Sequence, residues 1–214
     1  MTAPPSVPVG VILAGGQATR MGGGDKALLS LGDATILDSV IARLAPQVGA
    51  LALNANGEAA RFACLGLPVI PDPIEGFAGP LAGVLAGLDW AAGEGDETIV
   101  TVAGDTPFFP RDLVARLQAE AAGMTHPLVL AATPRGVEET KSMSAGGRVR
   151  HPTFGLWPVG LRDDLRAALE GGVRKVVQWT EKHAGREALF EDADAFFNVN
   201  TPEDLERARR RAGA

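Results

Sequence analysis

A glycine-rich segment near the N-terminus combines small residues with two cations. Residues 13–26, LAGGQATRMGGGDK, contain five glycines, with Arg20 and Lys26 spaced among and after them. Small residues let backbone N–H groups approach an anion closely, and the two cations can neutralise its charge. The segment therefore predicts a binding loop for a phosphate chain. A surface loop with glycines for flexibility alone would leave the two cations unexplained.

Two common phosphate-binding loops have a different spacing. A Walker loop requires a lysine followed by serine or threonine, whereas Lys26 precedes Ala27. The dinucleotide fingerprint requires G-x-G-x-x-G at the start of a helix and an acidic residue about 20 positions later. Residues 13–26 do not follow that order, so the loop belongs to another class of phosphate site.

The elements around this loop alternate between strands and helices. Apolar runs predict strands at 9–14, 50–54, 67–71, 98–103 and 128–132. Helical periodicity follows Thr35, Pro80 and Pro110, which suit the start of a helix. This alternation predicts an α/β fold with a single doubly wound, mostly parallel sheet, Rossmann-like, and helices on both faces. Such sheets bind ligands at the carboxyl ends of their strands, where the glycine-rich segment begins.

The last third of the chain has a weaker pattern. Residues 133–152 are glycine-rich, charged and without periodicity, which predicts a long flexible loop. Beyond it we expect a strand near 153–157, helices at 160–170 and about 173–182, and a strand at 189–191. A last helix is expected from Pro202, with Thr201 as its N-cap. All of these elements are assigned to one domain, residues 1–214.

Composition restricts the class of protein. A hydrophobic content of 46% supports a substantial core, and a net charge of −6 argues against a general nucleic-acid binder. Cys64 is the single cysteine, which excludes an internal disulfide, fits a reducing compartment and is expected to be buried. The first residues lack the features of a signal peptide, and no apolar run approaches the roughly 20 residues that span a bilayer. The sequence therefore predicts a cytoplasmic protein outside the membrane.

Landmarks along nearly the whole chain carry a family resemblance. Gly15, Gly16, Arg20, Met21, Gly22 and Lys26 resemble the signature loop of nucleotidyltransferases. Further landmarks follow in order: NAN (54–56), PD (71–72), GPLAG (79–83), GDTPF (104–108), HPTFGLW (151–157) and FFNVNTPEDL (196–205). Together they resemble the molybdenum cofactor guanylyltransferase family. Only the segment 133–150 is longer than that family leads us to expect.

The resemblance implies a reaction. Family members transfer GMP from GTP to the terminal phosphate of molybdopterin and release pyrophosphate. The N-terminal part, about residues 7–132, would mainly bind GTP. The C-terminal part, about residues 133–214, would mainly bind the acceptor. Two alternatives within enzymes are a molybdopterin cytidylyltransferase and a sugar-1-phosphate nucleotidyltransferase. A third alternative is a non-catalytic nucleotide-binding module.

The resemblance also assigns roles to residues. Asp105 and Asn200 would bind Mg²⁺, for which Mn²⁺ could substitute, although an aspartate after a strand can simply stabilise a turn. Lys26 would contact the triphosphate, and Arg20 the phosphates that leave; together with Asp105 they are the expected catalytic residues. Asp72 could accept hydrogen bonds from guanine N1–H and N2–H₂. The full expected GTP-binding set is Leu13, Ala14, Gly15, Gly16, Gly22, Lys26, Asn54, Asp72, Gly79, Pro80, Leu81 and Asp105.

The acceptor is anionic, so cations in the last third are its candidate contacts. The molybdopterin-binding candidates are His151, Arg174, Lys175, Asn198 and Asn200, although Arg174 and Lys175 fit a solvated helix face equally well. The expected partners are GTP and molybdopterin, with molybdenum-insertion proteins and molybdoenzyme chaperones as candidates. We expect a monomer that binds neither nucleic acid nor membrane.

Overall fold

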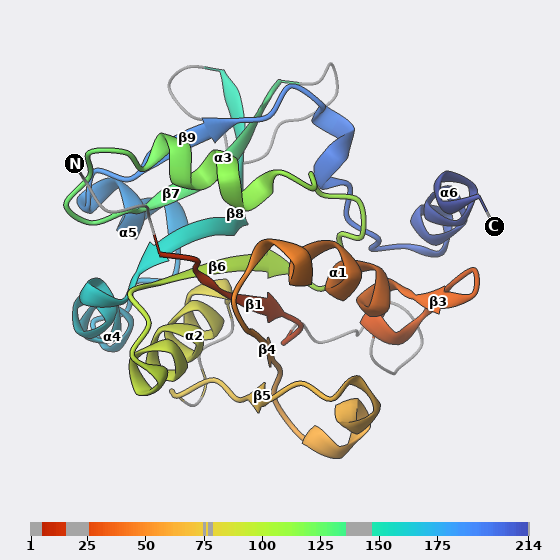
Figure 1. Ribbon diagram of the computed structural model, residues 1–214, viewed down its shortest axis with the longest axis horizontal. Helices are drawn as coiled ribbons and strands as arrows, with labels where there is room; N and C mark the ends of the chain where they lie inside the picture. The colour runs from red at the N-terminus through yellow and green to blue at the C-terminus, as the bar shows by residue number, and fades with distance from the viewer. Residues whose placement is uncertain (1–5, 16–25, 75, 77–78, 136–146, 214) are drawn as a thin grey trace.

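A seven-stranded sheet forms the centre of the protein (Figure 1). The computed structural model describes residues 6–15, 26–74, 76, 79–135 and 147–213. Within these residues the strand order is β5-β4-β1-β6-β8-β7-β9. The strands are β1 (Val9–Leu13), β4 (Leu51–Asn54), β5 (Val69–Ile70), β6 (Thr98–Ala103), β7 (Val129–Pro134), β8 (Arg148–Pro158) and β9 (Arg186–Leu189). Only β8 runs antiparallel to its neighbours in this sheet, so the prediction of a mostly parallel sheet is confirmed.

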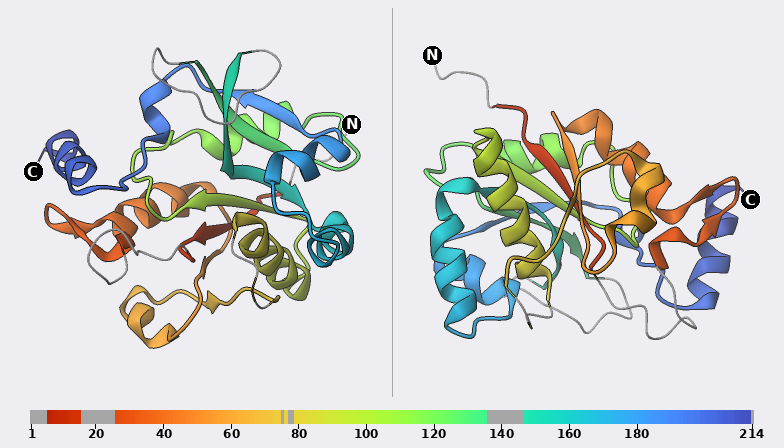
Figure 2. Two further views of the ribbon diagram at one scale, coloured as in Figure 1. Left: turned by 180° about the vertical axis from the view of Figure 1, so that it is seen from behind. Right: turned by 90° about the horizontal axis from the view of Figure 1, so that it is seen from below.

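Helices cover both faces of the sheet (Figure 2). The helices are α1 (Ile36–Leu44), α2 (Pro80–Glu94), α3 (Leu113–Glu120), α4 (Arg162–Glu170), α5 (Val176–Lys182) and α6 (Pro202–Ala212). Short 3-10 helices are η1 (Lys26–Leu28), η2 (Ala45–Gln47), η3 (Ala59–Leu65), η4 (Val159–Leu161) and η5 (Ala193–Phe196). Helices α1 and α3 pack on one face and α2, α4 and α5 on the other, which confirms the doubly wound prediction.

Successive side chains of the central strands enter two separate cores, one on each face of the sheet. In β1, Ile12 packs into the core beneath α1 and α3, whereas Val11 packs into the core beneath α2. In β6, Val100 and Ile99 divide in the same way. Successive side chains of a strand point to opposite faces of the sheet. A strand in which every residue is apolar can therefore contribute to both cores.

A third, smaller core joins the C-terminal helix to the first third of the chain. The antiparallel strands β2 (Ser30–Leu31) and β3 (Ala34–Thr35) lie beside α6, which stands apart from the other helices in Figure 1. Leu31 and Ile36 pack here against Val199, Leu205 and Ala208. This packing fixes the chain just before α6 next to the residues that follow the glycine-rich segment.

Two predicted helix starts have the expected cap. The hydroxyl oxygen of Thr35 accepts a hydrogen bond from the backbone of Asp38, and Thr201 accepts one from Asp204. Each aspartate in turn accepts from its threonine's backbone, which completes a capping box. Both N-caps are therefore confirmed, as is the start of α2 at Pro80.

The segment 133–152 differs from the predicted loop. Strand β7 continues to Pro134 and β8 begins at Arg148, so both ends of the segment are paired strands. Arg150 of β8 forms ion pairs with Glu187 at 2.5 Å and with Glu181 at 2.8 Å. These carboxylates balance the positive charge of Arg150, one of the charged residues for which this segment was predicted to be a loop. The residues between, 136–146, lie outside the described part.

The expectation for Cys64 is wrong. Its side chain is exposed on η3, where Phe62 is the residue that enters the core. The local pattern was ambiguous because Cys64 lies among small and apolar residues on a 3-10 helix rather than on a strand.

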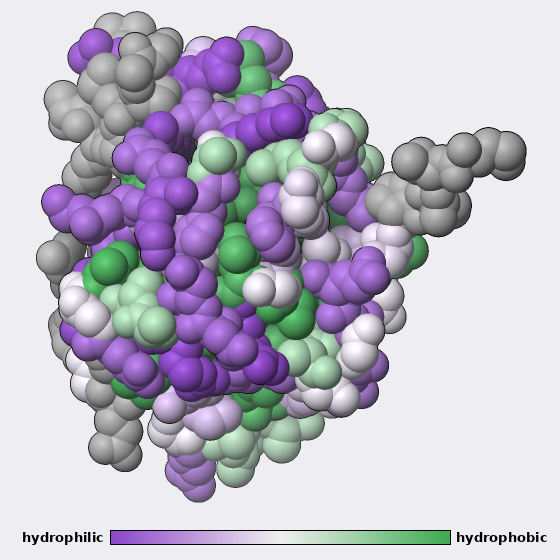
Figure 3. Space-filling model, turned by 90° about the vertical axis from the view of Figure 1, so that its left-hand side faces the viewer, coloured by the Kyte–Doolittle hydropathy of each residue, from purple (hydrophilic) through white to green (hydrophobic). Residues whose placement is uncertain are grey.

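On the surface opposite α6, the hydrophobic residues that the structure describes lie in small patches (Figure 3). Figure 3 shows this side, where hydrophilic residues separate the hydrophobic ones into small patches. Val7 is the one large hydrophobic residue classed as exposed in the described part of the chain. None of the described helices has the length and apolar character needed to cross a bilayer.

We predict that Gly87→Ala lowers the free energy of unfolding by about 1–3 kcal/mol, because an added methyl group would overpack the contact between α2 and the sheet. A Cβ at Gly87 would lie 2.8 Å from both Ile99 Cδ1 and Val11 Cγ2. The matched control is Gly93→Ala on the same helix, where a Cβ would meet no atom within 4 Å. That variant should be unchanged or more stable by about 0.5–1 kcal/mol. Urea unfolding measures both, and equal effects would contradict the proposed close approach.

Candidate functional site

Three neighbouring parallel strands end at the same edge of the sheet, and polar residues follow each of them. Strand β1 leads into residues 13–15, β4 ends at Asn54, and β6 leads into Asp105. The backbone N–H of Ala14 donates to Asn54 O at 2.9 Å, and that of Gly104 donates to Leu13 O at 3.0 Å. The start of the glycine-rich segment is thus held between the other two strand ends, as the fold rule predicts.

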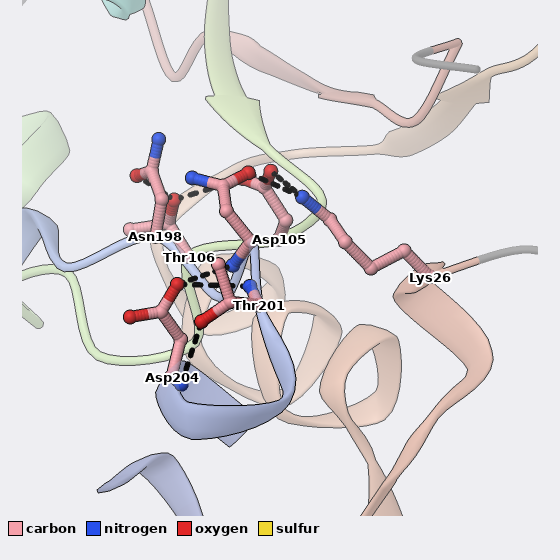
Figure 4. A network of polar contacts seen from close by, with 7 residues as sticks. Lys26, Asp105, Thr106, Asn198, Thr201 and Asp204 are labelled. Carbon is pink, nitrogen blue, oxygen red and sulfur yellow. Dashed lines mark hydrogen bonds and ion pairs between the residues drawn. The ribbon is translucent and has the colours of Figure 1, made fainter. Parts of the chain in front are cut away.

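Lys26, Asp105 and Asn200 meet at this edge (Figure 4). The ammonium of Lys26 donates to Asp105 Oδ2 and to Asn200 Oδ1, each at 2.7 Å. The two oxygens come from the end of β6 and from the residue before the α6 cap, and they converge on one cation. The relative solvent exposure of the side chain is 18% for Lys26 and 24% for Asp105, so a ligand can reach both from solvent.

The cap of α6 fixes Asn200 while leaving its side chain available. Both Asn200 and Thr201 donate their backbone N–H to Asp204 Oδ2, at 3.0 and 2.9 Å. The backbone N–H of Val199 donates to Asp105 O at 2.9 Å, which joins this segment to the end of β6. Because Thr201 provides the cap, the Asn200 amide oxygen is free to bind a cation.

The exposed Asn198 supports the same segment through a buried hydroxyl group. Its Oδ1 accepts a hydrogen bond of 2.7 Å from the buried Thr106 hydroxyl, which also lies 3.1 Å from Asp105 Oδ1. Asn198 is a candidate molybdopterin contact, and that role stays a prediction; in the structure its amide oxygen accepts from Thr106. Thr106 belongs to the GDTPF landmark but was not among the predicted site residues.

Two amides hold the carboxylate of Asp72. The Nδ2 of Asn54 donates to Asp72 Oδ1 at 3.0 Å, and the Nδ2 of Asn56 donates to Asp72 Oδ2 at 2.7 Å. Asn56 Oδ1 also accepts from the Asp72 backbone at 2.9 Å. A carboxylate has about four lone-pair sites, so Asp72 keeps capacity for a ligand. Asn56 belongs to the NAN landmark but was not among the predicted site residues.

The first turn of α2 approaches the Asn54 amide closely. A Cβ at Gly83 would lie 2.3 Å from Asn54 Oδ1 and 2.8 Å from Leu13 Cδ2, so this position requires glycine. Gly79 is the N-cap of α2 and Pro80 its first residue, at the same edge of the sheet. Leu81 was a predicted GTP contact, but its side chain is 1% exposed in the core. Only its backbone can take part in binding.

The acceptor candidates lie in different environments. The His151 ring stacks on Phe196 at 4.2 Å, and its Nε2 lies 3.0 Å from Thr133 Oγ1. Burial lowers the pKa of His151 to about 4, so it is neutral at neutral pH. Arg174 donates to Leu169 O and to Val173 O, both at 2.9 Å, and is exposed beside Lys175. A Cβ on Gly79 would lie 4.0 Å from Arg174 O, which places this corner next to the start of α2.

Several predicted residues lie outside the described part of the chain. These are Gly16, Arg20 and Gly22, all within residues 16–25. Among the residues that the structure does describe, no group of three or more histidines, cysteines, aspartates or glutamates could hold a metal ion. In the described part of the site, the oxygens that contact the Lys26 ammonium are one carboxylate oxygen, of Asp105, and one amide oxygen, of Asn200.

Comparisons with known proteins agree with this arrangement. Residues 10–186 match the family model of the MobA-like NTP transferase domain. A protein named molybdenum cofactor guanylyltransferase from Mesorhizobium japonicum is 49% identical over 208 residues, which are 94% of each chain. One of the same name from Rhodopseudomonas palustris is 50% identical over 211 residues, covering 96% of this chain and 92% of that protein.

Solved structures share the fold at lower identity. Molybdopterin-guanine dinucleotide biosynthesis protein A from Archaeoglobus fulgidus superposes with a TM-score of 0.72 at 21% identity, over 96% of this chain and 98% of that chain. A 2-C-methyl-D-erythritol 4-phosphate cytidylyltransferase from Thermus thermophilus gives 0.68 at 20% identity, over 95% and 98%. The solved structures show the fold, and the curated relatives show the family. The chain therefore belongs to the molybdenum cofactor guanylyltransferases and carries the MobA-like NTP transferase domain.

Proposed function

We propose that this enzyme transfers GMP from GTP to the terminal phosphate of molybdenum-bound molybdopterin, releasing pyrophosphate and forming the guanine dinucleotide cofactor. The structural observation that carries the proposal is the convergence of Asp105 and Asn200 on one cation beside the glycine-rich segment. The names of relatives about 49% identical over nearly the whole chain support the guanylyl transfer.

The reaction demands alignment and charge neutralisation from the protein. An oxygen of the acceptor phosphate attacks the α-phosphorus, and the bond from that phosphorus to the oxygen bridging to the β-phosphate breaks. Such transfers rely on positioning and on electrostatic stabilisation of negative charge. Lys26 and the backbone after β1 lie where a triphosphate would be held. Arg20 is assigned to the leaving phosphates by its place in the signature loop.

The proposed cofactor is Mg²⁺, with Mn²⁺ as a substitute, at Asp105 and Asn200. The donors fit, since two hard oxygens already share one cation, the Lys26 ammonium. Magnesium is usually held by one or two protein oxygens together with substrate phosphates and supplies charge neutralisation there. With a metal held by these two oxygens, the Lys26 ammonium would be available to contact the triphosphate.

Guanine selection is assigned to Asp72. Its carboxylate is oriented by Asn54 and Asn56 and can accept from guanine N1–H and N2–H₂ together. Cytosine cannot offer that pair of donors, which favours GTP over CTP. The shared fold with a cytidylyltransferase carries no information on the base.

The remaining assignments concern the acceptor and the cell. Arg174 and Lys175, with the neutral His151, are the proposed molybdopterin contacts of the part after residue 132, while Asn200 from that part serves the metal. We assign the protein to the cytoplasm as a monomer, with molybdenum-insertion proteins and molybdoenzyme chaperones as partners.

The reaction itself is tested by pyrophosphate release. We expect release from GTP and Mg²⁺ only when molybdopterin is added, with a guanine dinucleotide as the second product. CTP and a sugar 1-phosphate are the matched alternative substrates. Preference for either of these would replace the proposal by one of its enzymatic alternatives, and binding of GTP without turnover would favour a non-catalytic module.

We predict that Asp105→Ala lowers kcat by several orders of magnitude, because a metal held by Asp105 would contribute several kcal/mol of charge stabilisation to the transition state. Circular dichroism should show an intact fold. The control is Asp112→Ala, an exposed aspartate a few residues along, whose side chain makes no cap hydrogen bond. Near-normal turnover of folded Asp105→Ala in Mg²⁺ would remove Asp105 from the metal site.

Lys26→Ala should weaken GTP binding and slow transfer together, by roughly ten- to hundredfold, since a charge-assisted contact contributes about 1.5–3 kcal/mol. Guanosine, which has no phosphates, should lose much less affinity. Calorimetry gives both affinities, and Lys182→Ala on the exposed side of α5 is the control for charge. If GTP affinity and rate both stayed within twofold of the native enzyme, Lys26 would not be a phosphate ligand.

For Asn56→Ala we expect a smaller preference for GTP over ITP, because Asp72 loses one of its two amide donors and inosine lacks the N2 amino group. The ratio of the two kcat/KM values should fall about tenfold, which corresponds to one hydrogen bond to a charged group. Glu58→Ala, exposed in the same loop, is the control. A preference that stayed the same while overall activity fell would make Asn56 merely structural.

A further inference from the structure

A pocket lies between α1, α3 and α6, on the α1 and α3 face of the protein, and Phe108 and Pro110, which follow the end of β6, are part of its lining. It has a volume of about 640 Å³ and is lined by α1, α3, the chain from Phe190 to Ala195 and the end of α6. Volumes of this size are typical of sites for small ligands. It shares no lining residue with the candidate nucleotide and metal site, and the proposed reaction leaves it without a role.

Three arginines from three helices line this pocket. They are Arg43 of α1, Arg116 of α3 and Arg211 of α6. Each donates to a backbone carbonyl: Arg43 to Phe109 O at 3.0 Å, Arg211 to Asp194 O at 2.8 Å, and Arg116 to Leu189 O. A carbonyl fixes the direction of a guanidinium but leaves its positive charge in place.

Aromatic rings hold two of these cations against the wall. The guanidinium of Arg116 lies 4.4 Å from the ring centre of Phe190, and that of Arg211 lies 4.7 Å from that of Phe108. Contacts of this kind orient a guanidinium plane without supplying a negative charge. The arginines are therefore placed in advance for a ligand.

Two carboxylates, those of Glu191 and Asp192, line the pocket together with the three arginines. In the described part of the chain, no carboxylate lies within 4.0 Å of Arg43 or Arg116. Asp192 is 3.8 Å from Arg211, but its carboxylate also accepts from the Asp194 backbone at 2.9 Å. Glu191, also in the lining, is exposed.

The cations disfavour one another. Burial, and after it the positive charges of Arg111 and Arg211, lower the pKa of Arg43. Guanidinium groups stay charged in proteins nonetheless, so bringing them together costs free energy unless an anion joins them. In a chain with a net charge of −6, this concentration of positive charge is local rather than general.

We propose that this pocket is a second anion site, which binds a small, multiply charged oxyanion of the phosphate class. A guanidinium group can donate two parallel hydrogen bonds to two oxygens of a phosphate. A phosphate-class anion has enough oxygens to bind three guanidinium groups around one pocket, whereas a single carboxylate has only two. Inorganic pyrophosphate is the simplest such ligand, and it is the probe for the test.

The experiment is a calorimetric titration of pyrophosphate into protein saturated with GTP, without divalent metal. GTP occupies the first phosphate site, so any remaining binding reports the second. We expect one site in the native protein and at least tenfold weaker binding in Arg43→Gln/Arg116→Gln. The control Arg162→Gln/Lys182→Gln removes the same charge from α4 and α5 and should bind as the native protein does.

Two further variants keep the proposal testable if Arg43→Gln/Arg116→Gln does not fold. Arg211→Gln removes the cation at the exposed end of α6 and should weaken binding at least threefold. Arg43→Lys/Arg116→Lys keeps the charge without the fork and should give an intermediate affinity. The proposal is overturned if GTP-saturated native protein binds no pyrophosphate, or if folded Gln variants and the control bind it equally.

Discussion

The shared hold of Asp105 and Asn200 on the Lys26 ammonium connects the parts of the chain on which the site depends. One oxygen follows β6, the other precedes α6, and the cation stands just after the glycine-rich segment. Each partner is fixed by different means: by the strand, by the capping box of α6, and by the small core that contains Leu31 and Val199. Because the pair keeps partial exposure, the two oxygens are accessible to the proposed metal ion.

The distance between α2 and the sheet controls the second half of the site. Gly83 and Gly87 allow the helix to approach β1 so closely that side chains there would clash with Asn54 or with Val11. That approach keeps Asn54 buried, and Asn54 together with Asn56 orients the carboxylate of Asp72. Core packing and the proposed choice of base are thus parts of one arrangement, in which the glycines of a helix position an amide.

Charge is distributed unevenly over the protein. The acidic chain keeps its cations in specific places: Lys26 at the strand edge, Arg174 and Lys175 beside the start of α2, and the arginines around the pocket of α1, α3 and α6. Some arginines elsewhere pair with carboxylates, as Arg166 does with Asp89 and Arg150 with Glu187. A guanidinium bound only by carbonyls and rings differs physically from these pairs, since it retains the attraction for an anion.

The sequence by itself determined the features that act over a few residues. Apolar runs located the central strands, Thr35 and Thr201 located two helix starts as N-caps, and small residues with Lys26 and Asp105 predicted a phosphate and metal site. Only the tertiary structure decided which of these residues meet. Asn200 reaches Lys26, Asn56 reaches Asp72, and Thr106 reaches Asn198 across segments that no local pattern relates. The antiparallel course of β8 and the arginine pocket likewise arise from long-range pairing. Capping and periodicity are local interactions, whereas contacts between distant residues depend on how whole helices and strands pack.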